Sequence, residues 1–294
     1  MSPVPRPGRP ARAELKLSTD TPSHPPRWRP TPLVGASLGL HAAAVAALIA
    51  RPSAWPWVVG ALLADHATLA AATLVPRSRL LGPNWTRLPP GAARQRQVAI
   101  TLDDGPDPQD TPRVLALLEE RRVRATFFCI GERVRAYSEL AREITRRGHA
   151  IENHSHRHAH AFSLMGPRGL TREVERAQDT IGIVTGQRPA FFRAPAGFRN
   201  PFLDPVLSRL DLRLATWTRR GFDTVSASAG SVVAKLTGRL AAGDILLLHD
   251  GNAARDAAGQ PVVLEVLPRV LDAIAAADLT PITLRAALAG DSPI

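Results

Sequence analysis

Two adjacent carboxylates, Asp103 and Asp104, stand where an apolar run ends in the sequence ITLDDGPDPQD. The run at 98–102 is typical of a buried β-strand, and the Gly-Pro pair after the doublet ends it. Because Asp, Gly and Pro are also common turn residues, a turn is the simplest explanation. The alternative is a site in which the two carboxylates have different tasks, since neighbouring residues on an extended chain point in opposite directions.

A histidine cluster follows in the stretch NHSHRHAH. Its members are His154, His156, His158 and His160. A surface loop rich in histidine is the simple reading, and a metal site is the functional one. Two imidazoles need a third ligand, and a carboxylate such as Asp104 completes a set for a divalent ion with positions open to water. Asp103 would then stay free to accept a proton.

Two further polar residues end apolar runs, Arg193 in FFRAPAG and His249 in ILLLH. Arginine keeps its charge, so Arg193 can hold a neighbouring base ionised and oriented. His249 is a candidate general acid. Each of these residues alone is ordinary, and the hypothesis rests on their joint position at the ends of successive strands.

Strands alternate with helices from residue 97 onward, which predicts a parallel sheet. Seven such units suit a closed or nearly closed barrel, where chemistry gathers at the carboxyl ends of the strands. A capping box is expected to start one helix at Thr171. The predicted strands are 97–102, 125–130, 149–153, 190–194, 213–218, 244–249 and 280–284. The predicted helices are 111–122, 132–148, 170–186, 200–210, 228–241 and 263–277.

The amino-terminal third has a different composition. Residues 1–32 are rich in Pro and Arg and are expected to form a disordered tail. Two apolar segments, 33–50 and 58–75, have 18 residues each, about 27 Å as helix and just enough for a thin bilayer core. We therefore expect a transmembrane helical hairpin at 33–76, a linker at 77–96 and a catalytic domain at 97–294.

Asp65 and His66 argue against a simple span, because a carboxylate at mid-membrane costs about 2.5–3.5 kcal/mol. The alternative is an alanine-rich helical pair packed on the following domain. The first segment begins too late, and lacks the cleavage site, for a removable signal. Arginines flank both ends of the hairpin and only Arg51 lies in its turn, which favours a bacterial-type inner membrane with the catalytic domain on the cytoplasmic face.

The formal charge of +11 does not indicate nucleic acid as a partner. Arginines after residue 100 lie mostly beside Glu or Asp on predicted helices, as expected of solvated faces. No basic run is interleaved with aromatic residues that could stack on bases. Cys129 is the only cysteine, so an intrachain disulfide is excluded.

These motifs resemble those of the polysaccharide deacetylases of carbohydrate esterase family 4, which share the NodB homology domain. The resemblance covers about residues 95–286. TLDDGP at 101–106 stands for the family's Thr-Phe-Asp-Asp-Gly-Pro, and HSHRH at 154–158 for His-Ser/Thr-x-x-His. RAPAG at 193–197 matches Arg-x-Pro-x-Gly, and LLH at 247–249 matches Leu-x-His. The implied fold is an α/β distorted (β/α)7–8 barrel of the NodB type, preceded here by the apolar two-helix hairpin.

The resemblance also implies roles for individual residues. The metal ligands would be Asp104, His154 and His158. The catalytic group would be Asp103 as general base, Arg193 to steady it, His249 to protonate the leaving amine and Asp223 to tune that histidine. The substrate site would include Pro195, Gly197, Trp217 and Leu247.

The implied reaction is metal-assisted hydrolysis that removes an acetyl or formyl group from the nitrogen of an amino sugar in a polymeric or lipid-linked glycan. The family usually uses zinc, and a site of two histidines and one carboxylate also accepts cobalt, nickel or iron. Three positions depart from the family pattern, namely Arg220 and Thr224 in the fourth motif and Ala196 in the third. Two alternatives stay open: an O-acetyl esterase with the same site, and a sugar-binding barrel without catalysis.

Overall fold

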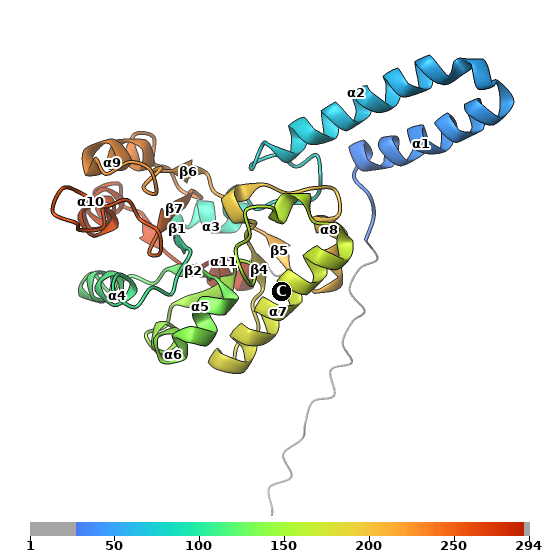
Figure 1. Cartoon of the computed structure of the whole chain (residues 1–294). Coiled ribbons are helices and arrows are strands. Elements are labelled where there is room, and N and C mark those ends of the chain that lie inside the picture. Colours follow the sequence, from blue (N-terminus) through green and yellow to red (C-terminus); the bar gives the residue numbers. More distant parts are fainter. Residues whose placement is uncertain (1–27, 291–294) are drawn as a thin grey trace, which may run out of the picture.

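The structure is a computed structural model that describes residues 28–290, so most of the expected tail at 1–32 lies outside the described residues. An apolar hairpin leads into a ring of helices around a curled parallel sheet (Figure 1). The strands are β1 Gln97–Asp103, β2 Thr126–Cys129, β3 Ala150–Asn153, β4 Phe191–Phe192, β5 Arg213–Leu214, β6 Arg219–Arg220, β7 Ile245–His249 and β8 Thr280–Pro281. The α-helices of the hairpin and barrel are α1 Pro32–Ala50, α2 Trp55–Thr73, α3 Pro90–Arg94, α4 Thr111–Glu120, α5 Gly131–Ala136, α6 Ser138–Arg146, α7 Pro167–Thr185, α8 Leu203–Arg209, α9 Ala229–Thr237, α10 Val263–Ala276 and α11 Leu284–Gly290. The 3-10 turns are η1 Pro52–Ala54, η2 Phe162–Leu164 and η3 Pro195–Gly197.

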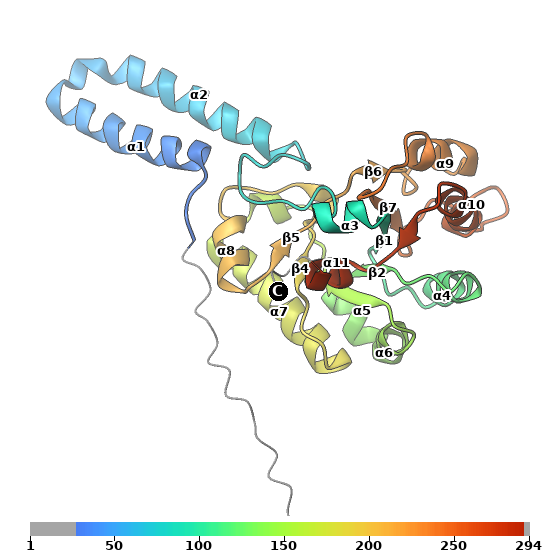
Figure 2. The ribbon, with the colours of Figure 1, turned by 180° about the vertical axis from the view of Figure 1, so that it is seen from behind.

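All strand pairs in the sheet are parallel, in the order β5-β4-β3-β2-β1-β7-β6, with β8 paired to the start of β1. Helices α4 to α10 surround the sheet in Figure 1, and Figure 2 shows α3 and α11 at the opposite end of the barrel. The predicted α/β barrel is therefore confirmed, in a form with β5 and β6 as its two edges.

Alternation along β1 decides which side chains face the barrel interior. Val98, Ile100 and Leu102 belong to the large cluster packed against the outer helices. Thr101 and Asp103 therefore point inward, where Asp103 meets a buried arginine. The apolar side chains of β1 thus pack against the outer helices, and its polar side chains face the interior of the barrel.

Residues 84–88, expected to be part of a linker, lie in the gap between the sheet edges. The amide of Trp85 donates to Leu214 O (2.9 Å), and its carbonyl accepts from the amide of Thr216 (3.0 Å). On the other side the amide of Leu88 donates to Gly243 O (2.8 Å). These bonds satisfy backbone groups that an open edge would leave exposed.

Three local predictions differ from the structure. The expected helix 132–148 is two helices, because Tyr137 has non-helical dihedral angles (φ −119°, ψ 51°) between α5 and α6. The capping box at Thr171 is wrong, because α7 begins at Pro167 and the Thr171 hydroxyl donates to Pro167 O inside the helix. The expected strand 213–218 ends after Leu214, where the chain leaves one sheet edge for the other.

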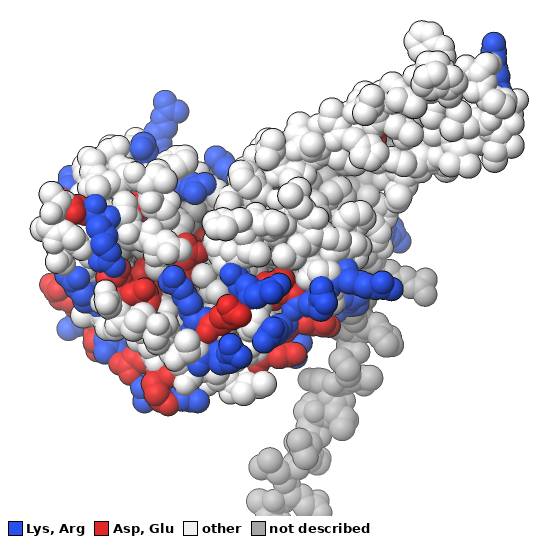
Figure 3. All heavy atoms as spheres, viewed as in Figure 1, with Lys and Arg blue, Asp and Glu red and all other residues white. Residues whose placement is uncertain are grey.

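The hairpin is two antiparallel helices joined at η1. Among the described helices, α1 is long and apolar enough to cross a membrane, a property shared by signal sequences and by core helices of soluble proteins. Length and composition thus support the first predicted span and not the second. Figure 3 shows a nearly uncharged hairpin surface beside a barrel studded with charges.

Replacing Trp85 tests whether residues 84–88 stabilise the barrel. Its ring packs edge-on against Phe191, with 5.0 Å between the centroids. We expect Trp85→Ala to lower the free energy of unfolding by about 3 kcal/mol, at the low end for Trp→Ala because the residue is only half-buried. Urea unfolding of the full chain measures this. Trp57→Ala, at a residue that is 84% exposed, is the control, and equal effects of the two substitutions would contradict the role given to this segment.

Candidate metal and catalytic site

Strand register brings the candidate residues to one end of the barrel. Asp103, the last residue of β1, is paired with His249 at the end of β7. Asn153 ends β3 opposite Phe192 in β4, so that His154 and Arg193, the next residue on each strand, leave the sheet side by side. The polar residues that the sequence places at the carboxyl ends of strands therefore lie together at one end of the barrel.

The two carboxylates of the doublet point to different partners. Asp103 Oδ1 accepts from Arg193 Nη1 (2.6 Å). Asp104 Oδ1 instead lies 3.2 Å from His154 Nε2 and 3.1 Å from His158 Nε2. Asp104 is in the left-handed region (φ 74°), a costly backbone for a non-glycine residue and one often found at functional sites. That backbone turns the second carboxylate away from the first.

The arrangement around Asp104 fits a metal ion. His154 Nδ1 lies 2.9 Å from Arg193 O, and since a carbonyl only accepts, that nitrogen carries the proton and Nε2 keeps its lone pair. Asp104 Oδ1 is buried and has no hydrogen-bond donor. Two ring nitrogens and one carboxylate oxygen, all within 4.8 Å of one another, are a common zinc ligand set.

Electrostatics keep Asp104 in the ligating form. Burial by itself raises the pKa of this carboxyl, but the electrostatic attraction of the imidazoles of His154, His249 and His158 around it outweighs the effect of burial. The net pKa lies well below the ordinary value. The carboxyl is therefore an anion at neutral pH.

Arg193 is fully buried and holds four acceptors. Besides Asp103, its guanidinium donates to the Thr101 hydroxyl (2.8 Å), to Ala215 O (3.1 Å) and to Thr216 O (2.6 Å). The cation also lies 4.0 Å from the centroid of the Phe128 ring. A charge so fully bonded can stay ionised out of water and fix the orientation of the carboxylate beside it.

His249 is oriented by Asp223. Its Nδ1 lies 2.8 Å from Asp223 Oδ1, and its backbone amide donates to Asp223 Oδ2 (2.8 Å). Burial lowers the pKa of His249, but the hydrogen bond and charge of Asp223, together with the charges of Asp103 and Asp104, raise it above its ordinary value. With Nδ1 occupied by Asp223, Nε2 is the nitrogen left to exchange a proton with a bound molecule.

The four predicted substrate residues lie around this centre. Gly197 has φ 80°, and a Cβ there would lie 2.6 Å from a ring carbon of Trp217 and 2.8 Å from Pro76, so only glycine fits. Pro195 precedes it in η3. Leu247 faces the same side of β7 as His249, two residues below it, and is 1% exposed. The Trp217 ring centroid lies 5.9 Å from the Arg193 guanidinium carbon, and Leu247 stands two residues before His249 in β7.

The three positions that depart from the family pattern have distinct surroundings. Ala196 is exposed, with φ 55°. The Arg220 guanidinium lies 5.2 Å from the centroid of Trp217 and 4.8 Å from that of Phe222. Arg220 has no acidic partner among the described residues, and its Nε is buried without a hydrogen-bond acceptor. Thr224, partly buried, stands next to Asp223.

Sequence reasoning missed several supporting residues. Asn252 Nδ2 donates to Asp104 Oδ2 (3.1 Å), and Arg133 Nη1 donates to Asp104 O (2.9 Å). Asp250 is buried beside Gly105, where a Cβ would lie 2.3 Å from its carboxylate, and burial raises its pKa to about 7. Thr101 could have been found from the alternation that puts it on the same face as Asp103. Asp250 directly follows His249 at the end of an apolar run and is indicated in the same way, whereas nothing in the local sequence indicates Asn252 or Arg133.

Comparisons with known proteins identify the family of this chain. The polysaccharide deacetylase family model matches residues 91–215. A peptidoglycan-N-acetylglucosamine deacetylase of Bacillus cereus is 32% identical over 163 residues, which are 55% of this chain and 76% of that protein. A chitooligosaccharide deacetylase of Azorhizobium caulinodans is 31% identical over 165 residues, 56% of this chain and 78% of that protein. The structure of a family 4 carbohydrate esterase from Streptomyces lividans, in complex with acetate, is similar with a TM-score of 0.57 and 29% identity, covering 63% of this chain and 91% of that one.

The chain belongs to the polysaccharide deacetylases of carbohydrate esterase family 4. It is accordingly a hydrolase of the deacetylase type, and the expectation drawn from the motifs is confirmed at that level.

The Asp223–His249 pair gives a prediction about pH. Asp223→Asn removes the largest of the effects that raise the pKa of His249, while burial still lowers it and the charges of Asp103 and Asp104 remain, so we expect that pKa to fall. A general acid works only when protonated, so the alkaline limb of the rate–pH profile should move to lower pH. NMR titration of the His249 ring and the profile itself measure the two effects. Asp211→Asn on the surface is the control, and an unchanged His249 pKa in Asp223→Asn would refute the coupling.

Proposed function

We propose that the protein is a metal-dependent hydrolase that removes an N-acyl group, acetyl or formyl, from an amino sugar of a glycan. One observation carries the proposal: Asp104, His154 and His158 converge on one point, while Asp103 next to them is held by Arg193 and its free Oδ2 lies 3.8 Å from His154 Nε2, beyond hydrogen-bond distance. A base that stays free beside a ligand set is what hydrolysis of an amide requires.

Asp104, His154 and His158 would hold the ion. When bound, a divalent cation supplies a Lewis acid that polarises the acyl carbonyl and lowers the pKa of a water. Zinc is the ion we favour, and the same donors suit cobalt or nickel.

The chain's own residues move the protons. Asp103 accepts a proton from the attacking water through Oδ2, since Oδ1 is bonded to Arg193. Arg193 keeps that carboxylate ionised and in place. Asp223 stabilises the protonated ring of His249, which then donates a proton from Nε2 to the departing nitrogen and becomes neutral. The C–N bond breaks, the water oxygen stays on the acyl carbon, and a free amine and a carboxylic acid result.

Substitution of each carboxylate separates the two roles. We expect Asp103→Asn to lower kcat by about 10²–10⁴-fold with the metal content unchanged. Asp104→Asn should lose the metal, because one of three ligands is weakened. Acetate release from N-acetylglucosamine oligomers and formate release from N-formyl amino sugars measure activity, with elemental analysis for bound metal. An O-acetylated sugar in the same panel tests the esterase alternative. Full activity of Asp103→Asn would exclude this mechanism.

We also propose that the hairpin anchors the enzyme in a bacterial-type inner membrane, which favours a lipid-linked glycan over a finished wall polymer. Large apolar side chains are exposed along both helices, for example Ile49 (79%) and Leu63 (67%). Their exposure is costly in water and favourable in lipid. Arginines at both flanks favour a cytoplasmic location for the tail and the barrel.

Reporter fusions test this topology. A reporter that works only in the cytoplasm should be active when fused at residue 1 or after residue 294. A reporter that works only outside the cytoplasm should be active when inserted at the turn near Ser53. If the fusions place the two termini on opposite sides of the membrane, the chain crosses it once, and α1 is the helix that crosses. Recovery of the unmodified chain in the soluble fraction would contradict the anchor.

A further inference from the structure

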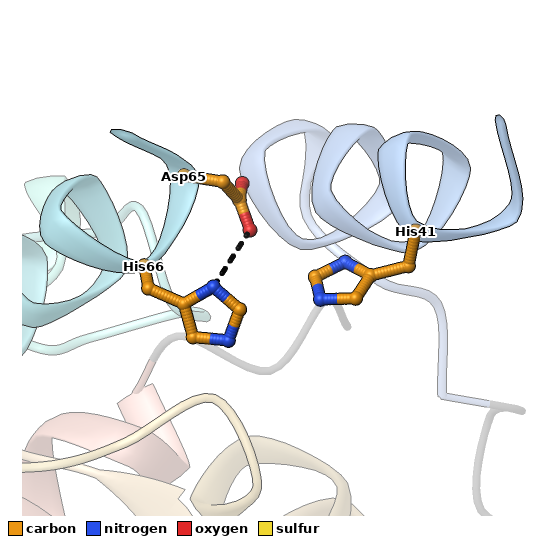
Figure 4. Close-up of side chains that lie close together, drawn as sticks. All are labelled: His41, Asp65 and His66. Atoms are coloured by element: carbon orange, nitrogen blue, oxygen red, sulfur yellow. Dashed lines mark ion pairs between the residues drawn. The ribbon is translucent and has the colours of Figure 1, made fainter. Parts of the chain in front are cut away.

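The two helices of the hairpin contain three ionisable side chains, and all three lie together. His41 is near the middle of α1, and Asp65 and His66 are near the middle of α2. One potential ligand atom from each lies within 4.8 Å of the other two. Figure 4 shows them facing one another across the space between the helices. In helices otherwise built from apolar and small residues, such a cluster calls for a specific partner.

Hydrogen bonds to the backbone fix the chemical form of both histidines. His41 Nδ1 lies 2.7 Å from Ser37 O, and His66 Nδ1 lies 2.8 Å from Leu62 O. Since a carbonyl only accepts, both Nδ1 atoms carry the proton and both Nε2 atoms keep a lone pair. A histidine that donates one ring N–H to a carbonyl and offers its other nitrogen is the usual form of a metal ligand.

The carboxylate in the cluster lacks a cationic partner. Asp65 Oδ2 accepts a hydrogen bond from the Ser37 hydroxyl (2.7 Å), and the side chain is only 9% exposed. The nearest ring nitrogen, His66 Nδ1, is 4.0 Å away, too far for a hydrogen bond, and its proton is already given to Leu62. Ser37 thus orients both a carboxylate and, through its carbonyl, an imidazole, without supplying charge.

We propose that His41, Asp65 and His66 form a second divalent-cation site, of the zinc type, that links α1 to α2. Two imidazole nitrogens and one carboxylate oxygen match the preference of zinc, cobalt and nickel. Ligands about 2.0–2.1 Å from a tetrahedral ion are about 3.3 Å apart, so the donor atoms need to approach one another further. Because Nδ1 is the His66 nitrogen nearest to Asp65, the ring also needs to turn to bring Nε2 to the ion, and its side chain is 63% exposed.

A bound cation would account for the two histidines, which the hydrogen bond between Ser37 and Asp65 does not require. Ser37 and Asp65 already join the two helices, and the rings of His41 and His66 pack edge-on with 5.3 Å between their centroids, a contact that leaves both Nε2 lone pairs unused. With the ion bound, one ligand from α1 and two from α2 close the hairpin across its middle. The site is separate from the barrel and does not rest on the proposed deacetylase chemistry.

Counting bound ions tests the proposal. The full chain in detergent micelles is stripped with a chelator and titrated with Co²⁺, whose visible spectrum reports coordination. We expect two equivalents for the wild type, one for His41→Ala/His66→Ala, and one for Asp104→Ala, whose remaining ion belongs to the hairpin. Thr68→Ala on α2 is the matched control, because its hydroxyl bonds only within its own helix, and it should bind two. A wild-type count of one that Asp104→Ala abolishes, or a count of two that the double variant leaves unchanged, overturns the site.

A ligand replacement identifies the residue even where alanine variants lose structure. His41→Cys keeps a ligand at the position, so it should bind cobalt and show a sulfur-to-cobalt charge-transfer band in the near ultraviolet. The wild type should lack that band, because its single thiol, Cys129, is buried in the barrel. Single loss of His41 to alanine should weaken binding at the second site at least about 100-fold, more than the loss of a supporting group costs. Cobalt binding by His41→Cys without the band would exclude His41 as a ligand.

Discussion

The buried contact between Arg193 and Asp103 is the constraint on which the site depends. A guanidinium with no exposure is tolerable only when its donors are bonded, and Arg193 meets that condition with acceptors from β1 and from the chain after β5. The same bonds turn Asp103 inward and leave its neighbour to the two histidines. Removing the arginine would leave a buried carboxylate in the barrel interior with His154 Nε2, 3.8 Å from Asp103 Oδ2, as its nearest basic group.

Closure of the barrel follows from the same region. Arg193 donates to the carbonyls of Ala215 and Thr216, where the chain crosses from one edge of the sheet to the other. Residues 84–88 pair with this stretch on their other side. The segment between hairpin and barrel therefore helps to hold the partners of the buried arginine in place, although its sequence has no regular pattern of its own.

Much of the site could be predicted because local sequence carries it. The apolar run before Asp103, the alternation on β1 and the histidine spacing each depend on neighbouring residues. The parts that could not be predicted depend on distant ones. Tyr137 breaks a helix without a Gly or Pro to mark it, and Pro167 starts α7 four residues before the expected cap. Asn252 reaches Asp104 across 148 positions of sequence, and no local pattern encodes such a contact.

The contact between Pro76 and Gly197 limits how freely the hairpin can move relative to the barrel. The chain leaving α2 is tied down at once, because Asn84 Nδ2 donates to Pro76 O (2.9 Å) and Ser78 O (3.1 Å), and Arg199 Nη2 donates to Ser78 O. A long flexible linker would allow the barrel many positions and orientations relative to the hairpin. This short segment is hydrogen-bonded to the barrel, so it restricts rotation of the hairpin relative to the end of the barrel that contains Gly197.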